Sequence, residues 1–372
     1  MEFRHQASDL PQYQSLPLSG KISIAKNRIR QWYEHWDGQV YVAFSGGKDS
    51  TVLLHLVREM YDDVPAVYCD TGLEYPEIRQ FALSHNNVIP VRPKMRFDEV
   101  IRKFGYPLFG KEIAKTINES RKIVSEDDKR YKYQRERMLG VAMHNGELSA
   151  FNMDKYLPIL QNLPVLISEK CCLQMKEKSM REYAKQTKRV PYIGTLAEES
   201  RRRRRMVWIM NGCNAYDGKE PHSNPLSVWT EQDIFQYILK YDVPIASVYG
   251  DIVYKDSDGM EYDAKTGIQC GKLSCSGCKR TGCIFCGFWA HIEKESRFVR
   301  LKHTHPKQYE YCIGGGEWID NPYYDPDAPE YTGEWKNWNP KQIWVPSKKG
   351  LGMGKVFDMV NEIMGDDFIR YK

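Results

Sequence analysis

A chain of 372 residues, 41% of them hydrophobic and 28% charged, is expected to fold into one large globular domain with an extension or into two domains. Its formal net charge of +5 is too small to indicate a nucleic-acid surface over the whole chain. No run of eighteen apolar residues occurs, and the N-terminal residues lack an apolar signal core, so we expect a cytoplasmic protein without a membrane span.

Strand-like and helix-like segments alternate in the first part of the chain. The pattern predicts a helix over 21–37, a strand at 40–44, a helix over 51–60, a strand at 65–69, a helix over 75–85 and a strand at 88–91. A further strand is predicted at 190–194 and a further helix at 231–241. This alternation favours an α/β fold with a parallel twisted sheet and helices on both faces. Ligands of such folds bind at the carboxyl ends of the strands.

Three segments interrupt or extend this pattern. Residues 111–150 are strongly charged and predict an exposed helical insertion, with a lid over the substrate as the alternative. Residues 250–279 form an insertion that carries Cys270, Cys275 and Cys278. We therefore predict an α/β domain over 1–312 and an irregular, aromatic-rich extension over 313–372 that ends in a short helix.

The strongest local signal is Ser45-Gly46-Gly47-Lys48-Asp49-Ser50, which lies between a predicted strand and a predicted helix. Glycines allow a tight turn close to a ligand, and the amides at a helix N-terminus favour an anion. Ser45, Ser50 and Thr51 add hydroxyl donors, and Lys48 adds a positive charge. The segment therefore predicts a phosphate-binding loop, although its spacing is shorter than that of the common nucleotide triphosphatases.

Carboxylates follow two neighbouring predicted strands. Asp49 and Asp70 are expected to position Mg²⁺ between phosphate oxygens, since this ion takes one or two carboxylates together with substrate phosphates. The alternative for Asp49 is a charge that the helix dipole stabilises. Asp70, Thr71 and Gly72 are expected to line the nucleotide site at the end of the second strand.

Ten cysteines in a reducing compartment indicate metal ligation rather than disulfides. Cys171 and Cys172 are adjacent, and Cys283 and Cys286 form a Cys-x-x-Cys pair. Adjacent thiolates chelate a single small ion poorly but can bind two irons of a cluster. The alternative is a zinc site in which Cys275 and Cys278 join the Cys-x-x-Cys pair.

An arginine-rich segment gives a third candidate site. Glu199 and Ser200 precede five arginines at 201–205, of which we expect Arg201 and Arg203 to face a bound oxyanion. The remaining arginines would then lie at the surface, where a nucleic-acid backbone is a candidate partner. A solvated basic helix face is the alternative.

The six-residue loop resembles the PP-loop of the ATP pyrophosphatase superfamily. Over residues 20–312, the order of the motifs is similar to that of the phosphoadenosine phosphosulfate (PAPS) reductase family. These motifs are 45–50, Asp70-Thr71-Gly72, Lys170-Cys171-Cys172, Gly194 to Arg201, Pro225 to Thr230 and Gly282 to Cys286. The stretch from Arg280 to Phe288 resembles a subgroup common in bacteria and phages, which is related to the enzymes that sulfurate the DNA backbone.

The resemblance implies an adenine-nucleotide α-hydrolase-like fold and a [4Fe–4S] cluster on Cys171, Cys172, Cys283 and Cys286. It also implies that the Glu-Ser-x-x-Arg segment beginning at Glu199 holds phosphate or sulfate. The chain departs from the family pattern in one respect that bears on its chemistry. Reductases of the family carry a catalytic cysteine in a C-terminal Glu-Cys-Gly-Leu-His motif, whereas no cysteine follows Cys312 here.

A complete phosphate loop without this nucleophile favours cleavage of ATP to AMP and pyrophosphate. The leading hypothesis is an iron–sulfur, ATP-dependent sulfur-transfer enzyme with nucleic acid as a candidate substrate. The alternatives are a sulfonucleotide reductase that produces sulfite with an external thiol, and a nucleic-acid-binding defence protein switched by a nucleotide. The expected catalytic residues are Lys48, Asp49, Arg201 and Arg203, and the expected nucleotide-binding residues are 45–51, 70–72, Glu199 and Ser200.

The hypothesis also predicts cofactors and partners. The cofactors are ATP, Mg²⁺ and the [4Fe–4S] cluster, with zinc as the alternative to the cluster. Candidate protein partners are a cysteine desulfurase or a thioredoxin-type donor, and a homodimer is a candidate assembly. Four tryptophans of the C-terminal part are expected mainly to pack within the extension, with base stacking as the alternative, and they are Trp318, Trp335, Trp338 and Trp344.

Overall fold

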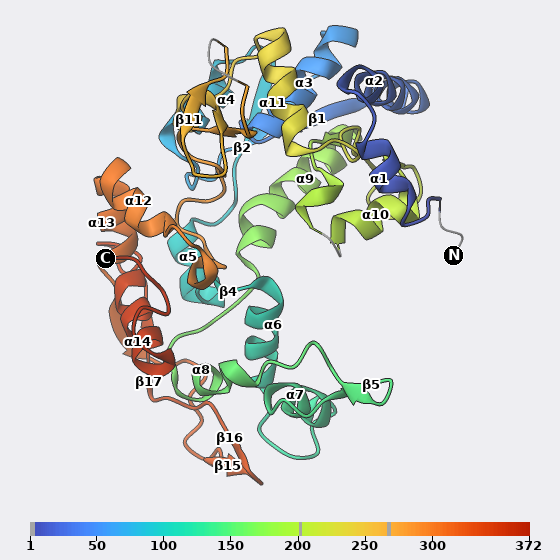
Figure 1. The fold of residues 1–372 in the computed structure, drawn as a ribbon. Helices are drawn as coiled ribbons and strands as arrows, with labels where there is room; N and C mark the ends of the chain where they lie inside the picture. Colours follow the sequence, from blue (N-terminus) through green and yellow to red (C-terminus); the bar gives the residue numbers. More distant parts are fainter. Residues whose placement is uncertain (1–3, 201–202, 266–268) are drawn as a thin grey trace. The chain divides into compact units, whose positions relative to one another are not determined.

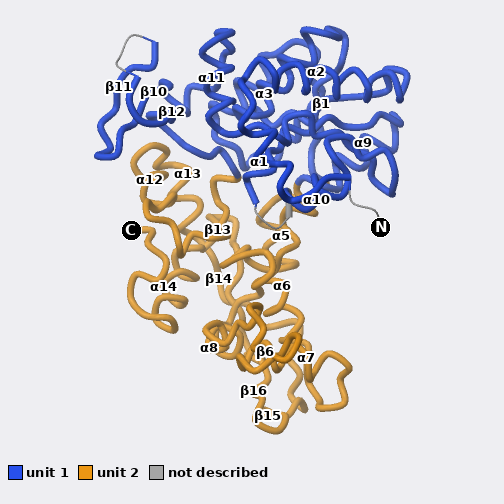
Figure 2. The backbone as a smooth tube through the Cα atoms, turned by 45° about the vertical axis from the view of Figure 1, so that its right-hand side comes forward, with its two compact units in different colours: residues 1–93, 176–282 blue, residues 94–175, 283–372 orange. Residues whose placement is uncertain are grey.

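The computed structural model describes residues 4–200, 203–265 and 269–372, and the chain divides into two compact units (Figure 1). Unit 1 contains residues 1–93 and 176–282, and unit 2 contains residues 94–175 and 283–372 (Figure 2). Each unit is therefore built from two separate stretches of the chain. The predicted domain boundary after residue 312 falls within unit 2 and stays a prediction.

Unit 1 is built around a six-stranded sheet with the strand order β3-β2-β1-β7-β9-β8. All neighbouring strands are parallel except β8 and β9. The strands are β1 (Val40–Phe44), β2 (Ala66–Cys69), β3 (Val88–Val91), β7 (Val190–Ile193), β8 (Asn214–Ala215) and β9 (His222–Ser223). The helices are α1 (Asp9–Gln14), α2 (Leu18–His35), α3 (Lys48–Met60), α4 (Pro76–Ser84), α9 (Lys178–Thr187), α10 (Arg203–Asn211) and α11 (Glu231–Tyr241), with the short turns η3 (Ala197–Glu199) and η4 (Ser247–Tyr249).

Alternating side chains of β1 face two different cores, as the period of two in a strand requires. Val40, Val42 and Phe44 belong to the larger core, which includes residues of α2, α3 and α11. Tyr41 packs on the other face with Val67 and with Tyr183 of α9. Helices therefore cover both faces, and the predicted α/β fold with a mostly parallel sheet is confirmed.

The cysteine-bearing insertion at 250–279 folds into its own small sheet in unit 1. Its strands β10 (Ile252–Lys255), β11 (Glu261–Asp263) and β12 (Lys272–Cys275) are antiparallel, with β10 in the middle. The insertion also reaches the main core of the unit, since Gln232 of α11 exchanges two hydrogen bonds of 2.9 Å with the backbone of Leu273 in β12.

Unit 2 is made of helices and short two-stranded ribbons. Its helices are α5 (Phe97–Phe104), α6 (Lys111–Ser120), α7 (Tyr131–Met138), α8 (Leu157–Asn162), α12 (Arg297–Thr304), α13 (Pro306–Ile313) and α14 (Met353–Met364), with the turns η1 (Asp154–Tyr156) and η5 (Ala290–Ile292). Its strands are β4 (Leu108–Phe109), β5 (Met143–His144), β6 (Glu147–Leu148), β13 (Gly287–Phe288), β14 (Glu317–Asp320), β15 (Tyr331–Thr332), β16 (Trp335–Lys336) and β17 (Gln342–Val345).

Two segments of unit 2 differ from the sequence-based expectation. The 111–150 segment holds the helices α6 and α7, but residues 143–148 form a hairpin instead of a helix. The extension is more regular than expected, because β14 pairs with β17 and β15 pairs with β16. In the described parts of the chain, no helix is long and apolar enough to cross a bilayer.

Candidate functional site

The predicted phosphate loop connects β1 to α3 in unit 1. Gly46 has a φ of +72°, and a Cβ atom there would lie 3.0 Å from the carbonyl oxygen of Ile78 in α4, so only glycine fits without strain. The Ser50 hydroxyl bridges the loop, because it donates to the Gly47 carbonyl at 2.8 Å and accepts from the Ser45 amide at 3.2 Å. Hydrogen bonds of its own serines therefore hold the loop in a tight turn that leads directly into the first turn of α3.

The Lys48 side chain is buried beside this loop. Its ammonium lies 3.0 Å from Glu231 Oε1 at the start of α11 and 3.4 Å from Asp49 Oδ1. Burial alone lowers the pKa of Lys48, but the charges of Asp49 and Glu231 outweigh it, and the pKa is raised. A charged lysine is therefore held next to the anion-binding end of the helix.

The backbone amide of Lys48 donates a hydrogen bond of 3.1 Å to the Tyr249 hydroxyl. The same hydroxyl shares a bond of 2.7 Å with the Thr281 hydroxyl. An amide at the first turn of a helix is the type of donor that phosphate oxygens use. Tyr249 therefore accepts from an amide of the type that the sequence analysis expected to bind an anion, and neither Tyr249 nor Thr281 was predicted as a site residue, because nothing local marks them.

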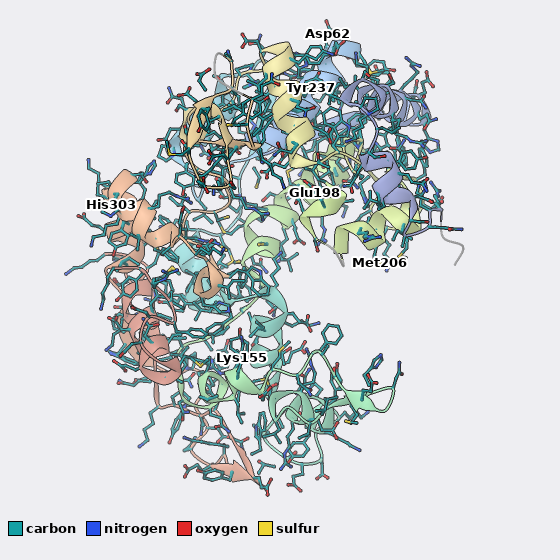
Figure 3. The ribbon with its side chains drawn as sticks, in the orientation of Figure 1. Asp62, Lys155, Glu198, Met206, Tyr237 and His303 are labelled. Carbon is teal, nitrogen blue, oxygen red and sulfur yellow. The ribbon has the colours of Figure 1, made fainter. Side chains whose placement is uncertain are left out.

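Several carboxylates surround Lys48. Burial raises the pKa of Asp49, and the charges of Glu199 and Glu231 raise it further, while Lys48 lowers it. Glu198, labelled in Figure 3, lies in η3 and accepts a hydrogen bond of 2.5 Å from the Glu231 amide. Burial raises its pKa as well. The site therefore combines one buried cation with acidic groups that a further cation would stabilise.

The second predicted segment, 70–72, follows β2 at the same edge of the sheet. The Asp70 carboxylate accepts two hydrogen bonds from the Arg79 guanidinium, of 2.8 and 3.0 Å, and lies 3.4 Å from the Arg92 guanidinium. The hydrogen bond from Arg79 is the main cause of the lowered pKa of Asp70. Asp70 is thus tied to two arginines in this structure, and its predicted role with Mg²⁺ stays a prediction.

Thr71 and Gly72 complete that segment. The Thr71 hydroxyl hydrogen-bonds the Glu74 carboxylate at 2.8 Å, and Lys176 forms an ion pair of 3.2 Å with the same carboxylate. Gly72 has a φ of +72°, and a Cβ atom there would meet nothing within 4 Å. The backbone beyond β2 therefore lies in open space, which suits a ligand-facing turn.

The third predicted segment lies after β7. Gly194 approaches the phosphate loop closely, since a Cβ atom there would lie 3.1 Å from the Asp49 carbonyl oxygen. The Glu199 carboxylate accepts from the Leu196 amide at 3.0 Å, which fixes the turn η3. Arg201 lies outside the described residues, and Arg203 is the first residue of α10. The predicted roles of both arginines stay predictions.

The four cysteines predicted for the cluster all belong to unit 2. The Cys171 and Cys172 sulfurs are 3.9 Å apart. The hydrogen bond with Cys172 raises the pKa of Cys171, and burial and the charges of Cys172, Cys286 and Cys283 raise it further.

This donor set fits an iron–sulfur cluster in its chemistry, because such clusters are held by four cysteine thiolates. The π-helical turn η2 (Leu173–Glu177) directly follows the first pair, and such turns often occur at functional sites. The Cys286 carbonyl accepts a bond of 3.0 Å from Arg297, which fixes the second pair. Within the described ranges, no three His, Cys, Asp or Glu side chains are arranged to hold a single metal ion.

The remaining cysteines of the zinc alternative belong to unit 1, together with the phosphate loop. Cys275 ends β12, and burial raises its pKa to about 11, with Lys48 as the main opposing charge. Cys278 lies beyond β12, and its thiol donates to the Arg280 carbonyl at 2.9 Å. Cys275 and Cys278 therefore belong to the unit that contains the loop at 45–50, whereas Cys283 and Cys286 belong to the same unit as Cys171 and Cys172.

A parallel sheet with a short glycine-serine loop at the carboxyl end of its first strand defines an α/β protein of the PP-loop kind. The family model of the phosphoadenosine phosphosulfate reductase domain matches residues 39–140 and 144–287. The chain belongs to this family, which confirms the resemblance seen in the motifs.

Individual relatives are distant. A phosphoadenosine 5'-phosphosulfate reductase of Alkalilimnicola ehrlichii is 22% identical over 220 residues, which cover 59% of this chain and 69% of the relative. The crystal structure of a PAPS reductase from Candida auris aligns with 65% of this chain and 90% of its own, at 12% identity and a TM-score of 0.34. The structure of the U34-tRNA thiolase NcsA from Methanococcus maripaludis with its [4Fe-4S] cluster aligns with 61% of this chain and 66% of its own, at 15% identity and a TM-score of 0.29.

Proposed function

We propose that this protein is an ATP-dependent sulfur-transfer enzyme that releases AMP and pyrophosphate. The observation that carries the proposal is the complete loop at 45–50 with the charged Lys48 buried beside it. An enzyme that only binds a nucleotide has no need to stabilise a departing pyrophosphate, whereas a lysine beside helix amides can stabilise that developing charge.

Each predicted residue has a role in this scheme. The loop and Thr51 would hold the phosphates, Lys48 would neutralise the leaving pyrophosphate, and Asp49 would position Mg²⁺. The 70–72 turn would lie against the adenine side. Glu199 and Ser200 would support Arg201 and Arg203, which would bind an anionic group of the acceptor.

The reaction would proceed in two displacements. An acceptor oxygen attacks the α-phosphorus of ATP, the bond from that phosphorus to the bridging oxygen breaks, and pyrophosphate leaves with its electron pair. A sulfur nucleophile at the oxidation level of sulfide then attacks the acceptor atom, and AMP leaves with the acceptor oxygen. A cysteine desulfurase would supply this sulfur as a persulfide, and a thioredoxin-type dithiol would reduce the outer sulfur to the level of sulfide while itself becoming a disulfide. A [4Fe–4S] cluster held by Cys171, Cys172, Cys283 and Cys286 would provide a binding site for it.

Cys312, the last cysteine of the sequence, is a poor candidate for the nucleophile of a reductase. Reductase chemistry needs an accessible thiol to attack the sulfonucleotide. No cysteine follows Cys312 in the sequence, and Cys312 itself is fully buried with a pKa raised by burial. A buried neutral thiol is a poor nucleophile.

A sulfonucleotide reductase that uses an external thiol is the second candidate, and membership of the PAPS reductase family favours it. One experiment separates the two. Anaerobically purified protein is incubated with Mg²⁺ and ATP labelled in the γ-phosphate, with candidate acceptors, and in parallel with PAPS and a thioredoxin system. Release of labelled pyrophosphate that depends on an acceptor supports sulfur transfer. Sulfite release without pyrophosphate release would replace the proposal by the reductase.

A further inference from the structure

Unit 2 contains a pocket of about 430 Å³. The predicted site residues are not among its described lining residues, although Cys171 directly follows the lining residue Lys170 in the sequence. Its volume lies in the range of small-molecule sites, about 300–1,000 Å³. Its walls are built by residues at and just beyond the C-terminal ends of α5 and α6, by residues 166–170 before the adjacent cysteines, and by residues 323–339 of the C-terminal extension. One wall of the pocket, residues 323–339 of the extension, lies beyond the family match, which ends at residue 287, whereas the lining residues from Lys103 to Lys170 lie within the match.

The wall of the pocket is cationic. Lys103, Arg121, Lys122 and Lys170 line it, and Asp325 is the one carboxylate among the described lining residues. Lys103 and Lys122 are exposed, so their ammonium groups are available to a ligand in solution. Such a balance indicates an anionic ligand.

Three aromatic rings share the same wall, namely Phe104, Tyr323 and Trp338. The Tyr323 side chain is 64% exposed and is free to stack on a planar group. The ammonium groups of Lys103 and Lys170 each lie 5.5 Å from the centre of the Phe104 ring. Cations beside aromatic faces are typical of surfaces that hold both the base and the phosphate of a nucleotide.

Trp338 is fixed in place by the polar framework behind it. Its ring nitrogen donates a hydrogen bond of 2.8 Å to the Leu163 carbonyl, and the Arg121 guanidinium lies 4.3 Å from its ring centre. Arg121 in turn donates to the carbonyl oxygens at the end of α8, including Ile159 and Leu160 at 3.0 Å. Burial lowers the pKa of Arg121 to about 9, which leaves it charged at neutral pH. Arg121 therefore supports the aromatic wall rather than the ligand directly.

A buried amide adds a hydrogen-bonding edge. Asn337 lines the pocket with only 6% of its surface exposed, and its Nδ2 atom donates to the Pro329 carbonyl and the Thr332 hydroxyl. Its Oδ1 atom is buried and has no hydrogen-bond partner among the described residues. An unsatisfied buried acceptor has an energetic cost, and a donor on a bound ligand would remove it. Exocyclic amino groups of nucleobases are donors of this kind.

We propose that this pocket binds a nucleotide unit of a single-stranded nucleic acid, which would be the acceptor of the reaction proposed above. The role of the strand as acceptor rests on that proposed function, whereas the binding of the strand does not depend on it. Two observations favour a strand over a free nucleotide. Lys103, Lys122 and Tyr323 line the pocket and are exposed, so they can also contact the neighbouring nucleotides of a strand. The loop at 45–50 in unit 1 is already proposed as the site for a free nucleotide. Lys170, which lines the pocket, directly precedes Cys171 in the sequence, so the backbone of the first cysteine pair continues from the pocket wall.

The test measures fluorescence anisotropy of a labelled twelve-nucleotide single strand, as RNA and as DNA, with the anaerobically purified full-length protein. The double variant Lys103→Ala, Lys122→Ala is expected to lower the slope of log K against log salt by about 1.4, because each phosphate contact on a single strand contributes about 0.7. Tyr323→Ala is expected to weaken binding about tenfold through lost stacking. All three residues are exposed, so these variants are expected to fold.

Matched controls lie in the same extension. The double variant Lys348→Ala, Lys349→Ala removes two exposed lysines outside the pocket, and Tyr331→Ala removes an exposed tyrosine there. Both controls are expected to bind like the wild type. Equal losses in the pocket variants and the controls would overturn the proposal, as would the absence of binding to any single strand. AMP that displaces the strand at the affinity of the strand itself would make the pocket a free-nucleotide site and also overturn it. Strand binding without acceptor-dependent pyrophosphate release would remove the proposed function and leave the binding site standing.

Discussion

Replacing Lys48 by methionine tests the electrostatic core of the nucleotide site. Methionine keeps most of the side-chain volume but removes the charge that lies 3.0 Å from Glu231 and 3.4 Å from Asp49. Breaking a fully buried ion pair costs about 3–5 kcal/mol, and an exposed pair contributes about 0–1 kcal/mol. Glu231 is about half exposed whereas Lys48 is buried, so we expect a loss of about 1–3 kcal/mol in the free energy of unfolding.

Thermal unfolding would record this loss as a fall in Tm of roughly 2–10 °C. Lys26→Met is the control, because Lys26 pairs with Glu59 on the surface and its removal should change the free energy of unfolding by less than about 0.5 kcal/mol. Release of pyrophosphate from ATP should fall about 10²–10³-fold in the Lys48 variant, the effect of removing one group that stabilises a developing charge.

The pH dependence has a definite sign. The pKa of Asp49 is raised in the folded protein by burial, although Lys48 lowers it, so the variant should raise it further. A group with a raised folded-state pKa binds protons more tightly in the native state, and its destabilising effect therefore diminishes as the pH falls toward that pKa. The difference in Tm between wild type and Lys48→Met should be largest near neutral pH and should shrink as the pH is lowered toward the raised pKa of Asp49. An undiminished difference at low pH, or an unchanged Tm at neutral pH, would refute this account.

Three further changes probe the site. Gly46→Ala should destabilise by about 2–4 kcal/mol in urea unfolding, because it adds strain at positive φ and a Cβ atom 3.0 Å from a carbonyl oxygen of α4. Gly72 has the same φ but open space around a Cβ atom, so Gly72→Ala should lose only the stability that the backbone strain costs. Equal losses of unfolding free energy in the two variants would contradict the expected clash at Gly46. Tyr249→Phe should strengthen ATP binding about 2–10-fold in calorimetry, because its hydroxyl no longer competes for the loop amide, and weaker binding would show that the hydroxyl contacts the ligand. Cys286→Ser should lower the iron and sulfide content and the visible absorbance of anaerobically purified protein, whereas Cys275→Ser should not, and one equivalent of zinc without iron in the wild type would contradict the cluster.

Much of unit 1 could be predicted from the sequence, because its signals are local. The strands β1, β2, β3 and β7 are short apolar runs, and the loop at 45–50 needs glycine at one fixed place between a strand and a helix. Hydrophobic periodicity and turn chemistry act within a few residues, so one sequence is enough to read them. The family match agrees with the order of these motifs.

The surroundings of the loop could not be read in the same way. Glu231 and Tyr249 reach Lys48 from about 200 residues further along the chain, and no local pattern marks either of them. Arg79 and Arg92 pack against Asp70, which the sequence analysis expected to position Mg²⁺, and no local pattern marks these two contacts either. Such contacts depend on how distant segments pack, which a single sequence does not encode in any short window.

The sequence by itself determined the α/β class, the tight glycine turn at 45–50 and the spacing of the two cysteine pairs, because each is a short pattern with its own physical requirement. Only the tertiary structure decided that both cysteine pairs belong to one unit and that Cys275 belongs to the other. It also brought Trp338, expected to pack, into the wall of a cationic pocket formed with Arg121. The reason is that a pocket is made by surfaces from separate stretches of chain, and only folding brings those surfaces together.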